Sequence, residues 1–145
     1  MIEVTVTGRV PRGLTMHDLE QALRLTFKKT RRTEQGSVSI AFITARRMRE
    51  LNKQWRHKDR STDVLSFSPA ASVTSPIRQW GDILVDPAYV NAEAKRRSIA
   101  FREEVLRVVV HGMLHLFGYD HATERDELKM FTLQERVIAE ATGSV

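Results

Sequence analysis

Three histidines near the end of the chain have the spacing of a metal site. Residues 111–121 read H-G-M-L-H-L-F-G-Y-D-H and contain His111, His115 and His121. Residues four apart lie on one face of a helix, so the first two rings would lie side by side. Gly118 permits a sharp turn that brings His121 back towards them. Three neutral imidazoles with one open position are typical of catalytic zinc, which lowers the pKa of a bound water to about 7.

The alternative is that these are ordinary helix histidines, satisfied by hydrogen bonds or solvent. Two of them, however, interrupt the apolar run V-V-V-H-G-M-L-H-L-F, where an unpaired polar ring is costly. The chain has no cysteine, so a metal must be held by His, Asp or Glu. We therefore predict one zinc ion on these three histidines, with no obvious fourth protein ligand. Asp120 is a candidate for a further ligand or for a partner that orients a ring.

The same histidine spacing occurs in metzincin proteases. Those enzymes need a glutamate directly after the first histidine as general base. Here that position is Gly112, which cannot transfer a proton. Peptide hydrolysis by that mechanism is therefore disfavoured.

The elements that must position these residues follow from the hydrophobic pattern. Strands are predicted over 2–7, 37–43, 63–67 and 82–85, and helices over 15–29, 44–55, 87–97, 101–117 and 123–141. Because strands come early and helices late, we predict an α+β fold: a small mixed sheet of about four strands packed with about five helices. The chain is predicted to be one domain, 1–145, with the metal site on the apolar helix and the turn after it. The long connection 68–79 is expected to be mobile or to cover the site.

The charge of the chain favours a polyanionic partner. Its net charge is +5, and residues 1–60 carry 14 basic against 6 acidic residues, whereas residues 61–145 carry 9 against 12. A basic surface attracts nucleic acid, although a merely solvated surface would have the same composition. No segment has the length and apolar character of a membrane span or a signal peptide, so a cytoplasmic protein without a membrane partner is expected.

The histidine block and two further segments of the chain resemble sequence motifs of the YbeY family of bacterial endoribonucleases. Residues 111–121 match the family's H-G-x-L-H-L-x-G-Y-D-H at every specified position. Residues 51–67, L-N-K-Q-W-R-H-K-D-R-S-T-D-V-L-S-F, are similar to L-N-x-x-Y-R-x-K-D-x-P-T-D-V-L-S-F, with Trp55 in place of Tyr and Ser61 in place of Pro. Gly81-Asp82-Ile83 matches a third, short signature.

This resemblance implies a zinc-dependent endoribonuclease for single-stranded RNA, acting in 16S ribosomal RNA maturation and in quality control of the small ribosomal subunit. It implies as partners ribosomal RNA, the small subunit, ribosomal proteins and an Era-like GTPase. The family's functionally important arginine falls on Arg56, which alone would be taken for a surface residue, and its first metal-binding histidine falls on His111. Arg56 can offer a planar fork to a phosphate and Lys58 a point charge. His57 stands where the family often has Gly, and its role stays open.

Three functions from different classes follow. The first is the metal-dependent endoribonuclease. The second is a non-catalytic ribosome-assembly factor that binds ribosomal RNA and whose zinc is structural. The third is a metallohydrolase of another substrate, such as a peptide, which Gly112 argues against.

Overall fold

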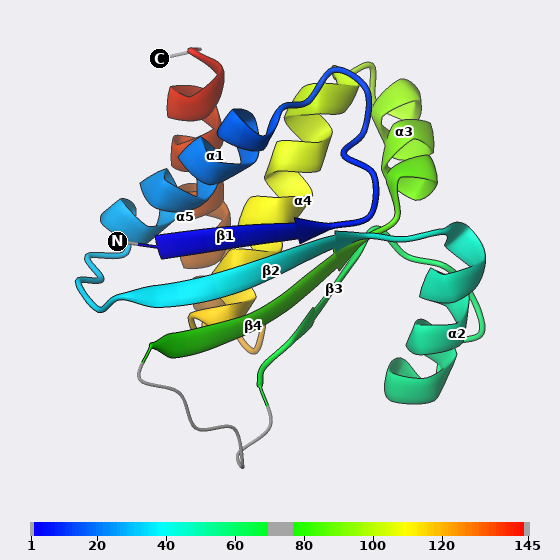
Figure 1. The fold of residues 1–145 in the computed structure, drawn as a ribbon, viewed down its shortest axis with the longest axis horizontal. Helices are drawn as coiled ribbons and strands as arrows, with labels where there is room; N and C mark the ends of the chain where they lie inside the picture. The colour runs from blue at the N-terminus through cyan, green and yellow to red at the C-terminus, as the bar shows by residue number, and fades with distance from the viewer. Residues whose placement is uncertain (1, 70–76, 144–145) are drawn as a thin grey trace.

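The computed structural model describes residues 2–69 and 77–143 and contains nine helices and strands in this part of the chain. Figure 1 shows their arrangement. In chain order they are β1 (Ile2–Thr7), α1 (Met16–Lys29), β2 (Gly36–Phe42), α2 (Ala45–Arg56), β3 (Val64–Phe67), β4 (Arg78–Val85), α3 (Pro87–Arg96), α4 (Phe101–Leu116) and α5 (Glu124–Thr142). Among the described residues, no helix has the length and apolar composition needed to cross a membrane.

The four strands form one mixed sheet in the order β1-β2-β4-β3. β1, β2 and β4 are parallel, and β3 pairs antiparallel with β4. Because the parallel strands are joined through helices and the remaining helices follow the sheet in sequence, the predicted α+β fold with a mixed sheet is confirmed.

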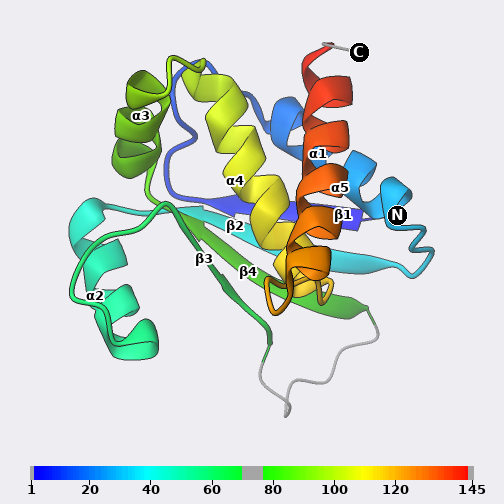
Figure 2. The same cartoon turned by 180° about the vertical axis from the view of Figure 1, so that it is seen from behind.

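Helices cover the two faces of the sheet unequally. α1, α4 and α5 lie across one face, which is turned to the viewer in Figure 2, while α2 stands beside the β3 end. The alternation along β3 reflects these two environments: Val64 packs against the main core and Ser66 donates a hydrogen bond to the Gly112 carbonyl, whereas Leu65 and Phe67 pack with α2.

α4 lies at the centre of the main core. Its buried residues include Val105, Leu106, Val109, Met113 and Leu114, each at most 1% exposed. This burial explains why apolar residues predominate in the second half of the helix, whereas its first turns carry charged side chains.

The strand β4 begins at Arg78, so the predicted start at Asp82 was wrong. The sheet shifts register between Ser37 and Val38, opposite Gly81, whose φ is +137°. This irregularity breaks the alternation of the sequence, but pairing with β2 continues beyond it as far as Arg78. The remaining predicted strands and the five predicted helices are confirmed to within two residues at their ends.

Residues 70–76 of the predicted connection 68–79 lie outside the described residues. The expectation that this connection is mobile or covers the site therefore stays a prediction, as does the single domain over 1–145.

Candidate metal centre and substrate groove

The three predicted histidines meet at one point. One ring nitrogen from each of His111, His115 and His121 lies within 4.8 Å of the others. The Nε2 atoms of His111 and His115 are 3.1 Å apart. Two imidazole ligands on one tetrahedral zinc ion would be separated by about 3.3 Å, given Zn–N distances of about 2.0–2.1 Å. The three side chains thus fit a single metal ion.

The turn after α4 brings His121 to this point. Gly118 has φ of +97°, and its N–H donates to the His115 carbonyl, while the N–H of Tyr119 donates to the Leu114 carbonyl. These bonds close the C-terminal end of the helix in the left-handed conformation that glycine adopts without strain. The Arg32 side chain also donates to the Phe117 carbonyl at 2.8 Å, which ties this turn to the end of α1.

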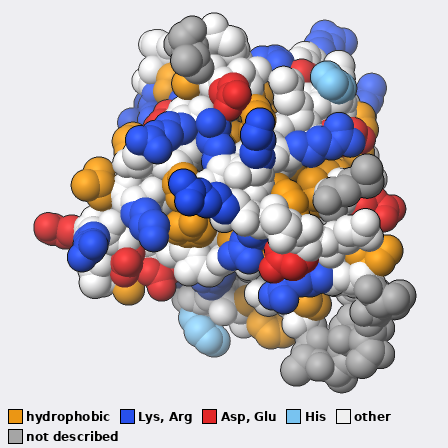
Figure 3. Space-filling model, turned by 90° about the vertical axis from the view of Figure 1, so that its left-hand side faces the viewer, with side chains coloured by type: hydrophobic (Ala, Val, Ile, Leu, Met, Phe, Trp, Pro, Cys, Tyr) orange, Lys and Arg blue, Asp and Glu red, His pale blue; other side chains and the backbone are white. Residues whose placement is uncertain are grey.

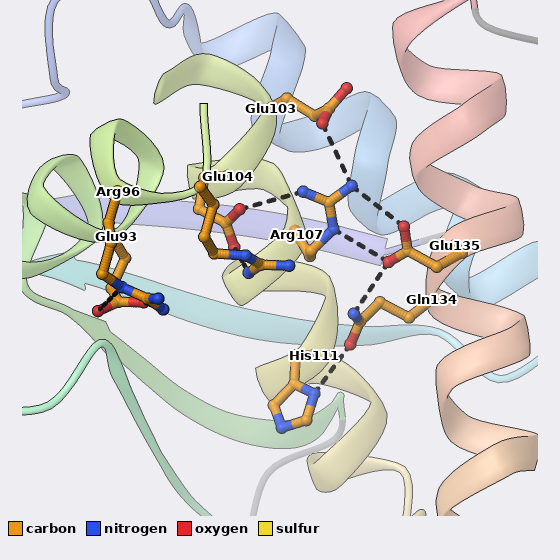
Figure 4. A network of polar contacts seen from close by, with 9 residues as sticks. Glu93, Arg96, Glu103, Glu104, Arg107, His111, Gln134 and Glu135 are labelled. Atoms are coloured by element: carbon orange, nitrogen blue, oxygen red, sulfur yellow. Dashed lines mark hydrogen bonds and ion pairs between the residues drawn. The ribbon is translucent and has the colours of Figure 1, made fainter. Parts of the chain in front are cut away.

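A chain of polar contacts fixes the orientation of the His111 ring (Figure 4). His111 Nδ1 lies 2.8 Å from Gln134 Oε1, and Gln134 Nε2 donates to Glu135 at 3.1 Å. Glu135 in turn accepts two hydrogen bonds from Arg107, at 3.0 and 3.1 Å. The amide nitrogen of Gln134 faces Glu135, so the amide oxygen faces His111. This oxygen can only accept a hydrogen bond, so Nδ1 of His111 must carry the proton. The Nε2 lone pair is therefore directed at the other histidines, as metal binding needs.

Burial and mutual proximity keep His111 and His115 neutral. Burial lowers the pKa of His111, although the hydrogen bond with Gln134 partly offsets it. Burial and the neighbouring His111 and His121 rings lower the pKa of His115 to about 4. A neutral imidazole is the form that binds a metal, so the site is prepared for one at neutral pH.

Gly112 allows α4 to approach the sheet closely beside this centre. A Cβ at position 112 would lie 2.9 Å from the Ile83 side chain and 3.0 Å from Ser66 Oγ. Position 112 therefore faces the sheet and has no room for a side chain. The absence of the metzincin glutamate thus follows from the packing of α4, and the described structure offers no proton acceptor at this position.

A groove of about 1030 Å³ leads away from the histidines along β3 and the end of α2. His111, His115, Arg56 and Lys58 are all among the residues that line it. Arg56 is close enough for its charge to contribute to the low pKa of His115, after burial and the other two histidines. The structure thus brings the two predicted substrate-binding residues into one cavity with two of the three predicted metal ligands.

The segment that carries Lys58 is held by α2. Asn52 is buried and donates from its side chain to the Arg60 carbonyl at 2.8 Å, and Arg49 pairs with Asp59 at 2.7 Å. His57 ends α2 with φ of +58° and is not among the clustered histidines. A left-handed residue at a helix end is usually glycine, so a histidine here is uncommon.

The aspartates near the site have structural contacts. Asp86 is buried, caps the start of α3 and accepts a hydrogen bond from Ser61 at 2.7 Å. Asp120 accepts from the Ala122 N–H at 3.1 Å and shapes the turn, and it does not belong to the clustered metal-binding groups. Asp63 accepts from the Val64 N–H and lines the groove.

Comparison with known proteins identifies the family. The family model described as Endoribonuclease YbeY matches residues 7–142. The chain belongs to the YbeY endoribonuclease family. The Endoribonuclease YbeY of Sulfurihydrogenibium sp. (strain YO3AOP1) is 43% identical over 106 residues, which cover 72% of this chain and 70% of that protein. The Endoribonuclease YbeY of Bartonella quintana is 32% identical over 142 residues, covering 94% and 90% respectively.

A solved structure has the same fold. The solution structure of TM1509 from Thermotoga maritima superposes with a TM-score of 0.67 at 32% identity and covers 99% of this chain and 91% of that one. The resemblance seen in residues 51–67 and 111–121 is thereby confirmed, and the predicted enzyme class agrees with the names of the YbeY relatives.

The sequence alone did not point to Gln134. This residue lies on α5, 23 residues from His111 in the sequence. The one available signal was a polar residue at a position of the helix where the pattern requires burial, and Gln134 is indeed 8% exposed.

Proposed function

We propose that this protein is a zinc-dependent endoribonuclease that cuts single-stranded RNA during 16S ribosomal RNA maturation and small-subunit quality control. The observation that carries the proposal is the groove that joins Arg56 and Lys58 to His111 and His115. Membership of the YbeY endoribonuclease family supports the reaction class.

The chemistry of the groove matches a phosphodiester substrate. The guanidinium of Arg56 can donate two parallel hydrogen bonds to the phosphoryl oxygens, and the ammonium of Lys58 adds a second positive charge. Negative charge builds up on those oxygens as the bond is cleaved, so donors held in place by α2 stabilise the transition state more than the ground state.

The histidines have a separate task in this proposal. His111, His115 and His121 would hold zinc, which can activate a nucleophile and polarise the phosphate when it is bound. Gln134 fixes the His111 ring, and burial with the neighbouring imidazoles keeps the His115 ring unprotonated at neutral pH.

The test is cleavage of a labelled ribosomal RNA precursor by the metal-loaded protein, with casein as a second substrate. Arg56→Ala, His115→Ala and chelator-treated wild type are purified identically as controls. We expect the wild type to cut RNA and leave casein whole. Arg56→Ala should lower kcat more than it weakens RNA binding, because its contacts strengthen in the transition state.

Arg56→Lys refines the test, since it retains the charge and removes the fork. RNA that is bound but left intact by every form would contradict the proposal and favour a ribosome-assembly factor with structural zinc. Equal cutting by all variants would indicate a contaminating ribonuclease. Circular dichroism of each variant separates loss of chemistry from loss of fold.

A further inference from the structure

A second cavity lies on the other side of the histidine centre. It has a volume of about 310 Å³ and is lined by His111, His121, Glu124, Glu127, Leu128, Met130, Phe131 and Gln134. His111 thus forms a wall of both this cavity and the Arg56 groove. The volume lies near the lower end of pockets that hold small organic groups.

The outer wall of this cavity is an unusual surface of α5. Leu128 and Phe131 are 65% and 57% exposed, and residues three and four apart share one face of a helix. An exposed pair of large apolar side chains beside a polar centre is typical of a binding surface. Phe131 has the flat ring on which a planar ligand can stack.

The two cavities differ in charge. The Arg56 groove also has Lys58 and Arg60 in its lining, whereas the second cavity contains no cationic side chain among its lining residues and includes Glu124 and Glu127. Neither glutamate forms an ion pair within residues 2–69 and 77–143. Phosphate therefore meets more cationic side chains in the first cavity than in the second.

We propose that the second cavity binds the nucleobase adjoining the scissile phosphate, with stacking on Phe131 and hydrogen bonds to Glu127. This inference rests on the proposed function. A base is neutral, flat and apolar on its faces, so it is the part of an RNA strand that suits an apolar pocket with acidic groups. It also lies one nucleotide from the phosphate that the groove would hold.

The carboxylate predicts which bases are preferred. An ionised carboxylate only accepts hydrogen bonds, so it pairs with the exocyclic amino groups of cytosine, adenine and guanine. Uracil has no amino group, and its one donor on this edge, N3–H, lies between two carbonyl oxygens that the negative charge repels. We therefore expect amino-bearing bases to bind better than uracil at this position.

The test uses short oligoadenylate, oligocytidylate and oligouridylate with metal-loaded protein. KM and kcat are measured on the ribo-oligonucleotides, and binding is measured by fluorescence anisotropy on their 2′-O-methyl forms. Phe131→Ala should raise KM for all three about tenfold, the size expected for one lost stacking contact, and leave kcat nearly unchanged. Glu127→Gln should remove the preference for amino-bearing bases, because an amide also donates.

Both altered residues are exposed, so neither substitution is expected to affect folding, and Thr132→Ala on the same helix but outside the cavity lining is the matched control. Unchanged KM, affinity and base preference in Phe131→Ala and Glu127→Gln would overturn the inference. So would variants that handle oligonucleotides normally but fail on ribosomal subunits, since the surface would then bind a protein. If the wild type cuts no RNA, the proposed function fails, while the binding measurements still decide whether the cavity accepts a base.

Discussion

Gln134 determines which nitrogen of His111 faces the other two histidines. An amide can be placed in either orientation, but here the neighbouring Glu135 accepts from its nitrogen at 3.1 Å. Burial alone would raise the pKa of Glu135, but hydrogen bonds from Arg107 and Gln134 lower it, so this acceptor is ionised. The orientation of the Gln134 amide thus follows from the negative charge on Glu135.

Replacing Gln134 with Leu should weaken zinc binding about 10- to 100-fold, the range seen when a partner of a metal-ligating histidine is lost. Leu retains the volume of the side chain but cannot accept the proton of Nδ1, so His111 loses its fixed tautomer. The measurement is competition with a chromophoric chelator at pH 7. Gln134→Glu keeps an acceptor oxygen and should retain most of the affinity, and equal weakening by both substitutions would argue against this role.

At the scale of elements, one ion pair joins the starts of α1 and α4. Asp18 closes the capping box of α1 with Thr15, and it also accepts from Arg102 at 2.8 Å. The hydrogen bond from Arg102 lowers the pKa of Asp18 to about 2. Burial opposes this shift, and the hydrogen bonds of the capping box with Thr15 add to it. A folded-state pKa below the unfolded value means that the ionised carboxylate stabilises the fold.

The stability from Asp18 should be fully present above pH 4 and lost as the pH falls towards 2. Between these limits the unfolded chain takes up the proton first, so Asp18→Asn should cost on the order of 2 kcal/mol at pH 6 and much less at pH 2.5. Urea unfolding followed by circular dichroism measures this difference. Arg102→Gln should remove the same pH-dependent part of the stability. The double variant, Asp18→Asn with Arg102→Gln, should be little less stable than either single variant. A cost that stays constant with pH would rule out the ion pair as its source.

The helices and strands differ in how well the sequence alone predicts where they begin. Thr15, Thr44 and Thr123 precede their helices with side chains that can cap them, so the helix starts were predictable. The histidines were predictable as well, because their spacing on α4 is local. The start of β4 was not, because it depends on pairing with β2 across the register shift at Gly81.

The contacts of Gln134 and the groove around Arg56 could not be predicted from local sequence patterns either. Gln134 lies 23 residues from His111, and its role depends on how α5 packs against α4. Arg56 and His115 line one groove because α2 stands at the β3 end of the sheet. Residues so far apart in the sequence share no helical or strand periodicity, so only resemblance to a family can point to them.

At the scale of the whole molecule, two of the regions that carry Lys and Arg side chains are well separated. One is the Arg56 groove, and the other is the side of the molecule where α1 ends. Figure 3 shows Lys and Arg side chains spread over that side, and the exposed Lys28 and Arg31 belong to the end of α1 and the turn after it. In Figure 1 this end and α2 lie at opposite ends of the sheet, so the two regions can be altered independently.

Replacing Lys28 and Arg31 together with Gln should therefore change RNA affinity without changing turnover. Each phosphate contact with single-stranded RNA contributes about 0.7 to the slope of log affinity against log salt. If both residues contact the backbone of a long RNA, the double variant should have a slope shallower by about 1.4 and an unaltered kcat. Arg56→Ala should instead lower kcat, with a smaller change in slope. Affinity would be measured by filter binding from 50 to 300 mM KCl. A double variant that binds long RNA like the wild type would restrict the interface to the groove, whereas one that loses kcat would contradict the separation of the two regions.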